Sequence, residues 1–162
     1  MEITFKEITK EDMLLVVEWL NDPVVKKYIA VEGEKKRTIK QQMAWYKEYQ
    51  MDKGKQAYTV YCDKIPIGYA GIFDINDFKK SGKLFITIGN VKYWGQGIGT
   101  FVTKRIIDIA FNQFDLLQLE LEVDERNKAA STIYQKAGFH KILERSHTKE
   151  DPYNVCMYKS KN

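Results

Sequence analysis

Residues 83–111, KLFITIG-NVKYW-GQGIG-TFVTKRIIDIAF, decide the fold of this chain. The apolar run at 83–89 predicts a β-strand, and residues 93–100 predict a glycine-rich turn. Apolar side chains at helical spacing predict a long helix over 98–114. The free N–H groups and the dipole at such a helix start favour a bound phosphate, and glycines at alternate positions let the backbone approach an anion closely.

Two nucleotide-binding motifs fit this turn poorly. A dinucleotide site needs G-x-G-x-x-G with several βα units after it, but the sixth position here is Thr100 and only one further βα unit follows. A P-loop needs G-K-[ST], whereas Gly99 is followed directly by Thr100. The glycine motif alone is also compatible with a tight structural turn that leads into a buried helix.

The sequence on both sides of this unit alternates between strand and helix signals. Thr38 opens a capping box with Gln41, Asn127 is a helix cap, and Gly138 is a left-handed helix end. The further predicted strands are 3–8, 57–62, 66–75, 117–123, 139–145 and 153–159, and the further helices are 10–20, 24–29, 39–52 and 128–137, with a loop at 30–37. Hairpins followed by a βαβ crossing predict an α/β protein of the α+β type, with a mixed sheet and helices on both faces.

Composition and charge exclude several classes of protein. The length of 162 residues predicts a single domain over 1–162. The 26 basic and 22 acidic residues give a net charge of +4, which is too small to indicate nucleic-acid binding. The charged N-terminus predicts no signal peptide and no membrane span, so we expect a cytoplasmic protein. Cys62 and Cys156 are expected to be reduced and structural. His140 and His147 lack metal-ligand spacing, so no metal is expected.

A second motif follows the strand predicted at 117–123. It has the spacing N-x-x-A-x-x-x-Y-x-x-x-G-F and consists of Asn127, Ala130, Tyr134, Gly138 and Phe139. Together with the glycine turn, this motif resembles the GNAT superfamily of acetyl-CoA-dependent N-acetyltransferases over most of the chain. WLNDPVVKKY at 19–28 and PIGYAG at 66–71 are similar to the branch that holds ribosomal-protein N-terminal, polyamine and aminoglycoside acetyltransferases.

The resemblance implies a GNAT-like fold with a central, mostly antiparallel sheet and with acetyl-CoA as co-substrate. The strand before the glycine turn would splay from its neighbour, and the acetyl group would lie in the gap. Backbone amides of the loop would bind the pyrophosphate, although Trp94 stands where Gln or Arg is usual. The implied acetyl-CoA-binding residues are Ile86, Thr87, Ile88, Trp94, Gly95, Gln96, Gly97, Ile98, Gly99, Thr100, Asn127, Ala130 and Tyr134.

The family's reaction is direct attack of an amine on the thioester in a ternary complex. Tyr134 is the candidate catalytic acid for the sulfur, because a phenol with a pKa of ~10 is protonated at neutral pH. Glu122 is the candidate catalytic base, since it stands in the pattern E-V-x-x-x-N of some N-terminal acetyltransferases. Lys83 occupies the position where many relatives carry Glu, and it cannot be an ordinary base. The structural alternatives are a plain cap for Asn127, core packing for Tyr134, and for Glu122 a solvated strand face or a partner of Lys83 or Lys128.

The expected function is transfer of an acetyl group to a primary amine, either a protein N-terminus or a small molecule. The alternatives are a non-catalytic acyl-CoA-binding module and an amino-sugar or aminoglycoside acetyltransferase. Basic runs at 26–27 and 35–37 would favour a phosphate-bearing amine or an acidic peptide, although Glu32 and Glu34 lie between them. The expected partner is an amine acceptor, with a homodimer as a further option and no nucleic acid or membrane.

Overall fold

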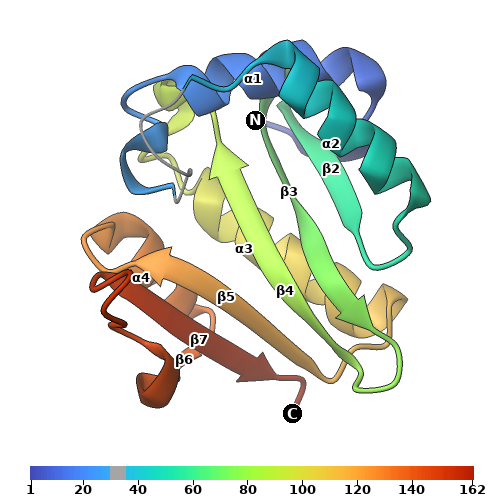
Figure 1. The fold of residues 1–162 in the computed structure, drawn as a ribbon. Helices are drawn as coiled ribbons and strands as arrows, with labels where there is room; N and C mark the ends of the chain where they lie inside the picture. Colours follow the sequence, from blue (N-terminus) through green and yellow to red (C-terminus); the bar gives the residue numbers. More distant parts are fainter. Residues whose placement is uncertain (30–35) are drawn as a thin grey trace.

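One seven-stranded sheet runs through the molecule in the order β1-β2-β3-β4-β5-β7-β6 (Figure 1). The computed structural model describes residues 1–29 and 36–162. Within these ranges every neighbouring pair of strands is antiparallel except β4 and β5, which are parallel. The predicted mixed sheet is therefore confirmed. The strands are β1 (Ile3–Glu7), β2 (Gln56–Cys62), β3 (Ile65–Asn76), β4 (Ser81–Ile88), β5 (Gln118–Asp124), β6 (His140–Lys141) and β7 (Asn154–Ser160).

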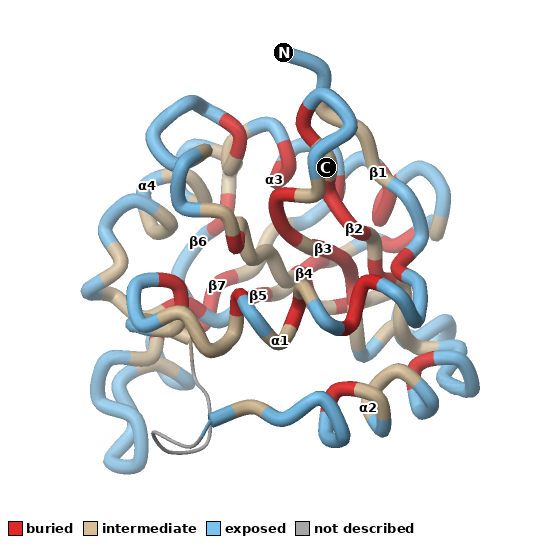
Figure 2. The backbone as a smooth tube through the Cα atoms, turned by 90° about the horizontal axis from the view of Figure 1, so that it is seen from above, coloured by how far each residue is buried: buried red, intermediate tan, exposed pale blue. Residues whose placement is uncertain are grey.

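Helices cover both faces of the sheet, as predicted. They are α1 (Met13–Asn21), α2 (Ile39–Met51), α3 (Ile98–Asp108) and α4 (Lys128–Lys136). Figure 2 shows α1 and α2 on one side of the sheet and α3 and α4 on the other. The predicted capping box begins α2, because Thr38 Oγ1 accepts from the Gln41 amide at 3.2 Å and the Thr38 amide donates to Gln41 Oε1 at 3.0 Å.

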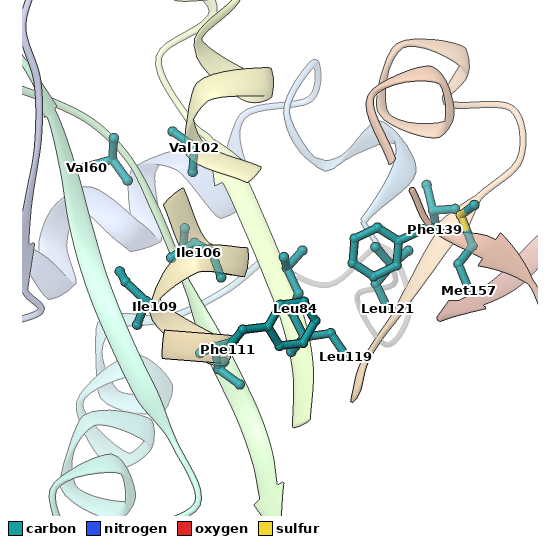
Figure 3. Close-up of a cluster of buried hydrophobic side chains, with 14 of the residues drawn as sticks. Val60, Leu84, Val102, Ile106, Ile109, Phe111, Leu119, Leu121, Phe139 and Met157 are labelled. Carbon is teal, nitrogen blue, oxygen red and sulfur yellow. The ribbon is translucent and has the colours of Figure 1, made fainter. Parts of the chain in front are cut away.

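Each face of the sheet has its own apolar core. The larger core joins the sheet to α3 and α4 and contains Val102, Ile106 and Leu119, all completely buried (Figure 3). The smaller core joins the sheet to α1 and α2 and contains Met13 and Trp19. Burying these side chains supplies the free energy that fixes both helical layers on the sheet.

Three predicted elements differ from the structure. The strand predicted over 139–145 ends at Lys141 (β6), because the chain curls into a 3-10 turn over Leu143–Arg145 after the Ile142 amide bonds the Cys156 carbonyl at 2.8 Å. The helix predicted over 24–29 is a single 3-10 turn, Lys26–Tyr28, and buries none of these three residues. The α-helical part of the 98–114 helix ends at Asp108, and a π-helical turn follows over Ile109–Gln113. Residues 30–35 of the predicted loop lie outside the described residues.

The strands β4 and β5 pair only at their beginnings. Their parallel register ends at Lys83 opposite Glu120, and Figure 1 shows them parting beyond this point. The far end of β4 is held toward α1, because the Trp19 indole packs so closely on Gly89 that an added Cβ would overlap it. The far end of β5 is paired with β7 as far as Asp124. Because the two strand ends have different partners, the sheet is open between them.

Candidate active site

A cleft of about 800 Å³ opens where β4 and β5 part. Its walls come from β4, β5, α4, residues 27–29 and the segment between β6 and β7. The cleft brings together three groups of predicted site residues, namely the β4 residues Ile86 and Thr87, the β5 residue Glu122 and the α4 residue Tyr134. These residues lie far apart in the sequence, so the parting of the strands is what assembles them.

The cleft is reached by side chains from both faces of the sheet. Successive side chains of a strand point to opposite faces. On β4, Ile86 packs against the core beneath α3, whereas Phe85 packs with the core beneath α1 and α2. On β5, Leu121 and Val123 belong to the α3 side, so Glu122 points to the α1 and α2 side. Glu120 and Asp124 alternate with the same buried residues and therefore share this face with Glu122.

The glycine turn presents unpaired backbone amides beside α3. Gly95 and Gly97 have φ angles of 72° and 80°, a left-handed conformation that glycine adopts without strain. The first helical hydrogen bond runs from the Phe101 amide to the Gly97 carbonyl at 3.1 Å. Within the described residues, the amides of 96–100 donate to no acceptor. These amides and the start of α3 form an anion-binding arrangement.

Trp94 and Gln96 brace this loop. The Trp94 indole Nε1 donates to the Ile88 carbonyl at 2.8 Å and ties the loop to the end of β4. Gln96 Nε2 donates to the Lys92 carbonyl at 2.8 Å. The indole of Trp94 therefore occupies the carbonyl of Ile88, one of the residues that the resemblance implied for acetyl-CoA binding.

Asn127 begins α4 as a helix cap. Its Oδ1 accepts from the Ala130 amide at 3.2 Å, so the predicted cap is confirmed. Its Nδ2 has no hydrogen-bond acceptor among the described residues. Asn127 can therefore cap the helix and donate to a ligand carbonyl at the same time.

Tyr134 reaches the cleft from the last turn of α4. Its half-buried ring packs edge-on against Phe139, with the ring centroids 6.1 Å apart. Burial raises the pKa of Tyr134 to about 12, because the charged phenolate is poorly solvated there. Among the described residues its hydroxyl has no hydrogen-bond partner, so it is a neutral donor that lines the cleft.

Glu122 is an exposed carboxylate on the cleft wall. Its Oε1 accepts weakly from Asn154 Nδ2 at 3.5 Å and lies 3.7 Å from the Cys156 thiol. Within the described residues it has no ion pair. Lys83 instead lies 3.7 Å from Asp74, so the structural alternative that made Glu122 a partner of Lys83 does not hold.

The neighbouring carboxylates on β5 are paired with arginines. Arg145 contacts Glu120 at 2.8 Å, and Arg126 contacts Asp124 at 2.6 Å. The hydrogen bond from Arg126 lowers the pKa of Asp124. Glu122 is thus the β5 carboxylate left without an arginine.

Arg126 is a cleft residue that sequence reasoning missed. Its guanidinium lies 3.9 Å from the ring centroid of Tyr153 and 5.9 Å from that of Tyr28. It joins the turn after β5 to two distant segments of the cleft wall. No local pattern marks this contact, because both tyrosines are remote in the sequence.

Other features of the described residues bear on cofactor and location. No group of three or more His, Cys, Asp or Glu side chains in these ranges could hold a metal ion. In the same ranges, no helix has the length and apolar character needed to cross a bilayer. Cys62 and Cys156 are free and buried, as predicted.

Comparison with known proteins gives the family. The model of the acetyltransferase (GNAT) domain matches residues 2–140. The spermidine N(1)-acetyltransferase of Escherichia coli strain K12 is 31% identical over 94 residues, which are 58% of this chain and 50% of that protein. The aminoglycoside N(6')-acetyltransferase type 1 of Klebsiella pneumoniae is 21% identical over 166 residues, covering 96% of this chain and 81% of that protein.

A solved structure shows the same fold. The spermidine N-acetyltransferase from Vibrio cholerae, crystallised with CoA and spermine, superimposes with a TM-score of 0.87 at 21% identity and covers 98% of this chain and 95% of its own. The chain therefore belongs to the GNAT acetyltransferase family, which confirms the resemblance read from the two motifs. This chain spans about half the length of the Escherichia coli relative that it matches.

The glycine loop can be tested as a CoA-binding site by Gly97→Val. An added Cβ at Gly97 meets nothing within 4 Å, so valine enters open space at the loop without a clash inside the protein. We expect the affinity for acetyl-CoA to fall roughly 100-fold, because charge-assisted bonds to the phosphates are lost. The left-handed φ should cost only about 1–2 kcal/mol of unfolding free energy. Calorimetry measures the first effect and urea unfolding the second.

Lys64→Val is the matched control, because Lys64 has a φ of 70° in an exposed turn between β2 and β3. It also places a valine at a left-handed φ, away from the loop and where the wild-type side chain already carries part of that strain. Acetyl-CoA affinity should be unchanged in this variant. Gly99→Val is a poorer test, since its Cβ would lie 3.1 Å from Ile133 Cδ1 and disturb the packing of α3 on α4. Wild-type affinity in the Gly97 variant would remove the loop from the binding site.

Proposed function

We propose that this protein is an acetyl-CoA-dependent N-acetyltransferase that transfers the acetyl group to a primary amine by direct attack in a ternary complex. The observation that carries the proposal is the cleft between β4 and β5, which joins a free strand edge to a neutral phenol. The unpaired loop amides lie outside the cleft lining, between the end of β4 and the start of α3. Membership of the GNAT family supports the same reaction. The Vibrio cholerae relative was crystallised with CoA and spermine, which makes an amine acceptor reasonable here.

The residues on the α3 and α4 side fit the parts of acetyl-CoA in turn. The amides of 96–100 suit the pyrophosphate, and the open edge of β4 around Ile86 and Thr87 suits the pantetheine amides. Asn127 Nδ2 is available to a pantetheine carbonyl. Bound acetyl-CoA supplies an activated thioester carbonyl and a thiolate leaving group.

Glu122 is the proposed base on the opposite side of the cleft. It points to the α1 and α2 face, has no arginine partner, and can attract an ammonium group and accept its proton. A lysine-like amine with a pKa of ~10.4 is only about four parts in ten thousand neutral at pH 7, so a base that accepts its proton makes attack faster. The position of Glu122 on the cleft wall and its lack of an arginine partner both support the role of a base.

Tyr134 is the proposed acid. Its raised pKa of about 12 keeps the phenol protonated at neutral pH, and its hydroxyl is available to donate to the sulfur as negative charge develops there. Packing against Phe139 holds the ring on the cleft wall. Core packing and catalysis are therefore compatible roles for this residue.

Tyr134→Phe should lower turnover by ~10²–10⁴-fold, or about 3–5 kcal/mol of barrier, with little change in acetyl-CoA affinity. Because the phenol stays protonated up to a pH of about 12, the loss should be nearly constant between pH 6 and pH 10. Thiol release at saturating substrate measures turnover at each pH. Full turnover in the Phe variant would leave Tyr134 with a packing role alone.

Glu122→Gln should behave differently with pH. We expect a loss of perhaps 10²-fold at neutral pH that shrinks as the pH rises, because free amine then becomes abundant without a base. Glu125→Gln is the control, since Glu125 follows β5 outside the residues that line the cleft. Equal rates for Glu122→Gln and the wild-type protein at every pH would return Glu122 to a structural role.

A non-catalytic acyl-CoA-binding module is the second candidate. One observation favours it, because Lys83 stands on β4 where many relatives have Glu, and it is engaged with Asp74. The enzyme proposal predicts CoA release when amines are added, and the module predicts acetyl-CoA binding without release. A panel of peptides, polyamines, aminoglycosides and amino sugars separates the two and identifies the acceptor class.

Two further points complete the proposal. A dodecamer is reported for the Vibrio cholerae spermidine N-acetyltransferase, so we propose that this chain also forms a homo-oligomer, which light scattering would measure. The two free, buried thiols fit a reducing compartment, and a cytoplasmic location is part of the proposal on that ground.

A further inference from the structure

A second, smaller pocket lies beside the cleft on the α1 and α2 side of the sheet. Its volume is about 300 Å³, and its lining includes the aromatic rings of Trp45, Tyr69 and Phe85. Phe73 and Phe85 line both the pocket and the cleft, so the two spaces share a wall. The pocket therefore opens on the side from which Glu122 faces the cleft, where an acceptor amine would enter.

Arg37 is held rigidly at this pocket. Its amide donates to Asn21 Oδ1 at 2.7 Å, and its carbonyl accepts from Asn21 Nδ2 at 2.8 Å. Its side-chain Nε donates at 3.1 Å to Oε1 of Gln42, a residue only 4% exposed. These bonds leave the two terminal guanidinium nitrogens of Arg37 to donate to another acceptor. Their planar arrangement matches two oxygens of a carboxylate or a phosphate.

Among the described residues, the lining of this pocket contains two cationic side chains and no acidic one. Lys55 is its second cation, and the Lys55 Nζ lies 5.8 Å from the ring centroid of Trp45. Within the described ranges, neither Arg37 nor Lys55 has a carboxylate within 4.0 Å, and no Asp or Glu is among the lining residues. Two cations beside an apolar wall are stabilised by a bound anion and disfavour a polycation.

We infer that the acceptor amine carries an anionic group, a carboxylate or a phosphate, which Arg37 binds in this pocket while the amine reaches the cleft. The inference rests on the proposed acetyltransferase function and names its substrate class. An apolar segment between the anion and the amine would lie along the shared wall of Phe73 and Phe85. Lys55 adds charge at the same pocket, and the aromatic rings exclude water from the ion pair.

The test compares four acceptors of matched carbon chain, with acetyl-CoA saturating. Hexylamine has no second charge, diaminohexane has a second cation, and aminohexanoate and aminohexyl phosphate carry the two anions. We expect kcat/KM for at least one of the anionic amines to exceed that for hexylamine about tenfold or more, with diaminohexane the poorest. Comparing the two anionic amines distinguishes a carboxylate from a phosphate.

Arg37→Gln should lower kcat/KM for the preferred anionic amine roughly ten- to hundredfold, change it little for hexylamine, and leave the KM for acetyl-CoA unaltered. Lys55→Gln should also lower kcat/KM for the preferred anionic amine, by a smaller factor. This variant tests the inference if the Arg37 variant unfolds. Lys40→Gln, an exposed cation on α2, is the control and should leave the preference unaltered.

The outcomes separate the two proposals. Acetylation of hexylamine or diaminohexane at least as well as the anionic amines overturns the inference and leaves the acetyltransferase function standing. An anionic preference that survives Arg37→Gln also overturns it. No transfer to any amine by a protein that binds acetyl-CoA overturns the proposed function, and this inference with it.

Discussion

The parting of β4 and β5 is the feature from which the whole site follows. Beyond Lys83 and Glu120, β4 stays paired with β3 and packs on Trp19 of α1 at Gly89, while β5 stays paired with β7. A sheet that stayed paired there would satisfy its own backbone groups and leave no room between the strands. The parting creates both the cleft and the free strand edge that a ligand's amides can bind.

The two faces of the opened sheet differ in their chemistry. On the α3 and α4 face, backbone amides dominate, from the loop at 96–100 to the cap at Asn127. On the α1 and α2 face, charged side chains dominate, and arginines pair with Glu120 and Asp124 but leave Glu122 free. Amides suit a long polar cofactor, whereas a single unpaired carboxylate suits a proton transfer. In the proposed reaction, acetyl-CoA and the amine would meet from opposite sides of the sheet.

Local signals in the sequence predicted the features that depend on nearby residues. The capping box at Thr38, the cap at Asn127 and the left-handed Gly138 were all foreseen, because each depends on bonds within a few positions or on one φ angle. The periodicity of strands and helices predicted the mixed sheet with helices on both faces. The length of β6 was overestimated, because this edge strand ends before a 3-10 turn that the residue pattern alone does not reveal.

Contacts between distant segments could not be predicted in this way. The contact of Arg126 with Tyr28 and Tyr153, and the pinning of Arg37 by Asn21, join residues that no periodicity relates. The bond from the Trp94 indole to the Ile88 carbonyl likewise changes the role of a residue that the motif placed in the phosphate loop. These contacts depend on tertiary packing, and they determine the charge and shape of the site.

Amide hydrogen exchange with and without acetyl-CoA tests most directly whether the open sheet is the place of reaction. Binding in the cleft predicts slower exchange for amides on the free edge of β4 between residues 84 and 88 and for the loop amides of 96–100. The β1 strand, at the far edge of the sheet, should be unaffected. Acetyl-CoA binding that leaves the exchange of both segments unaltered would contradict the account.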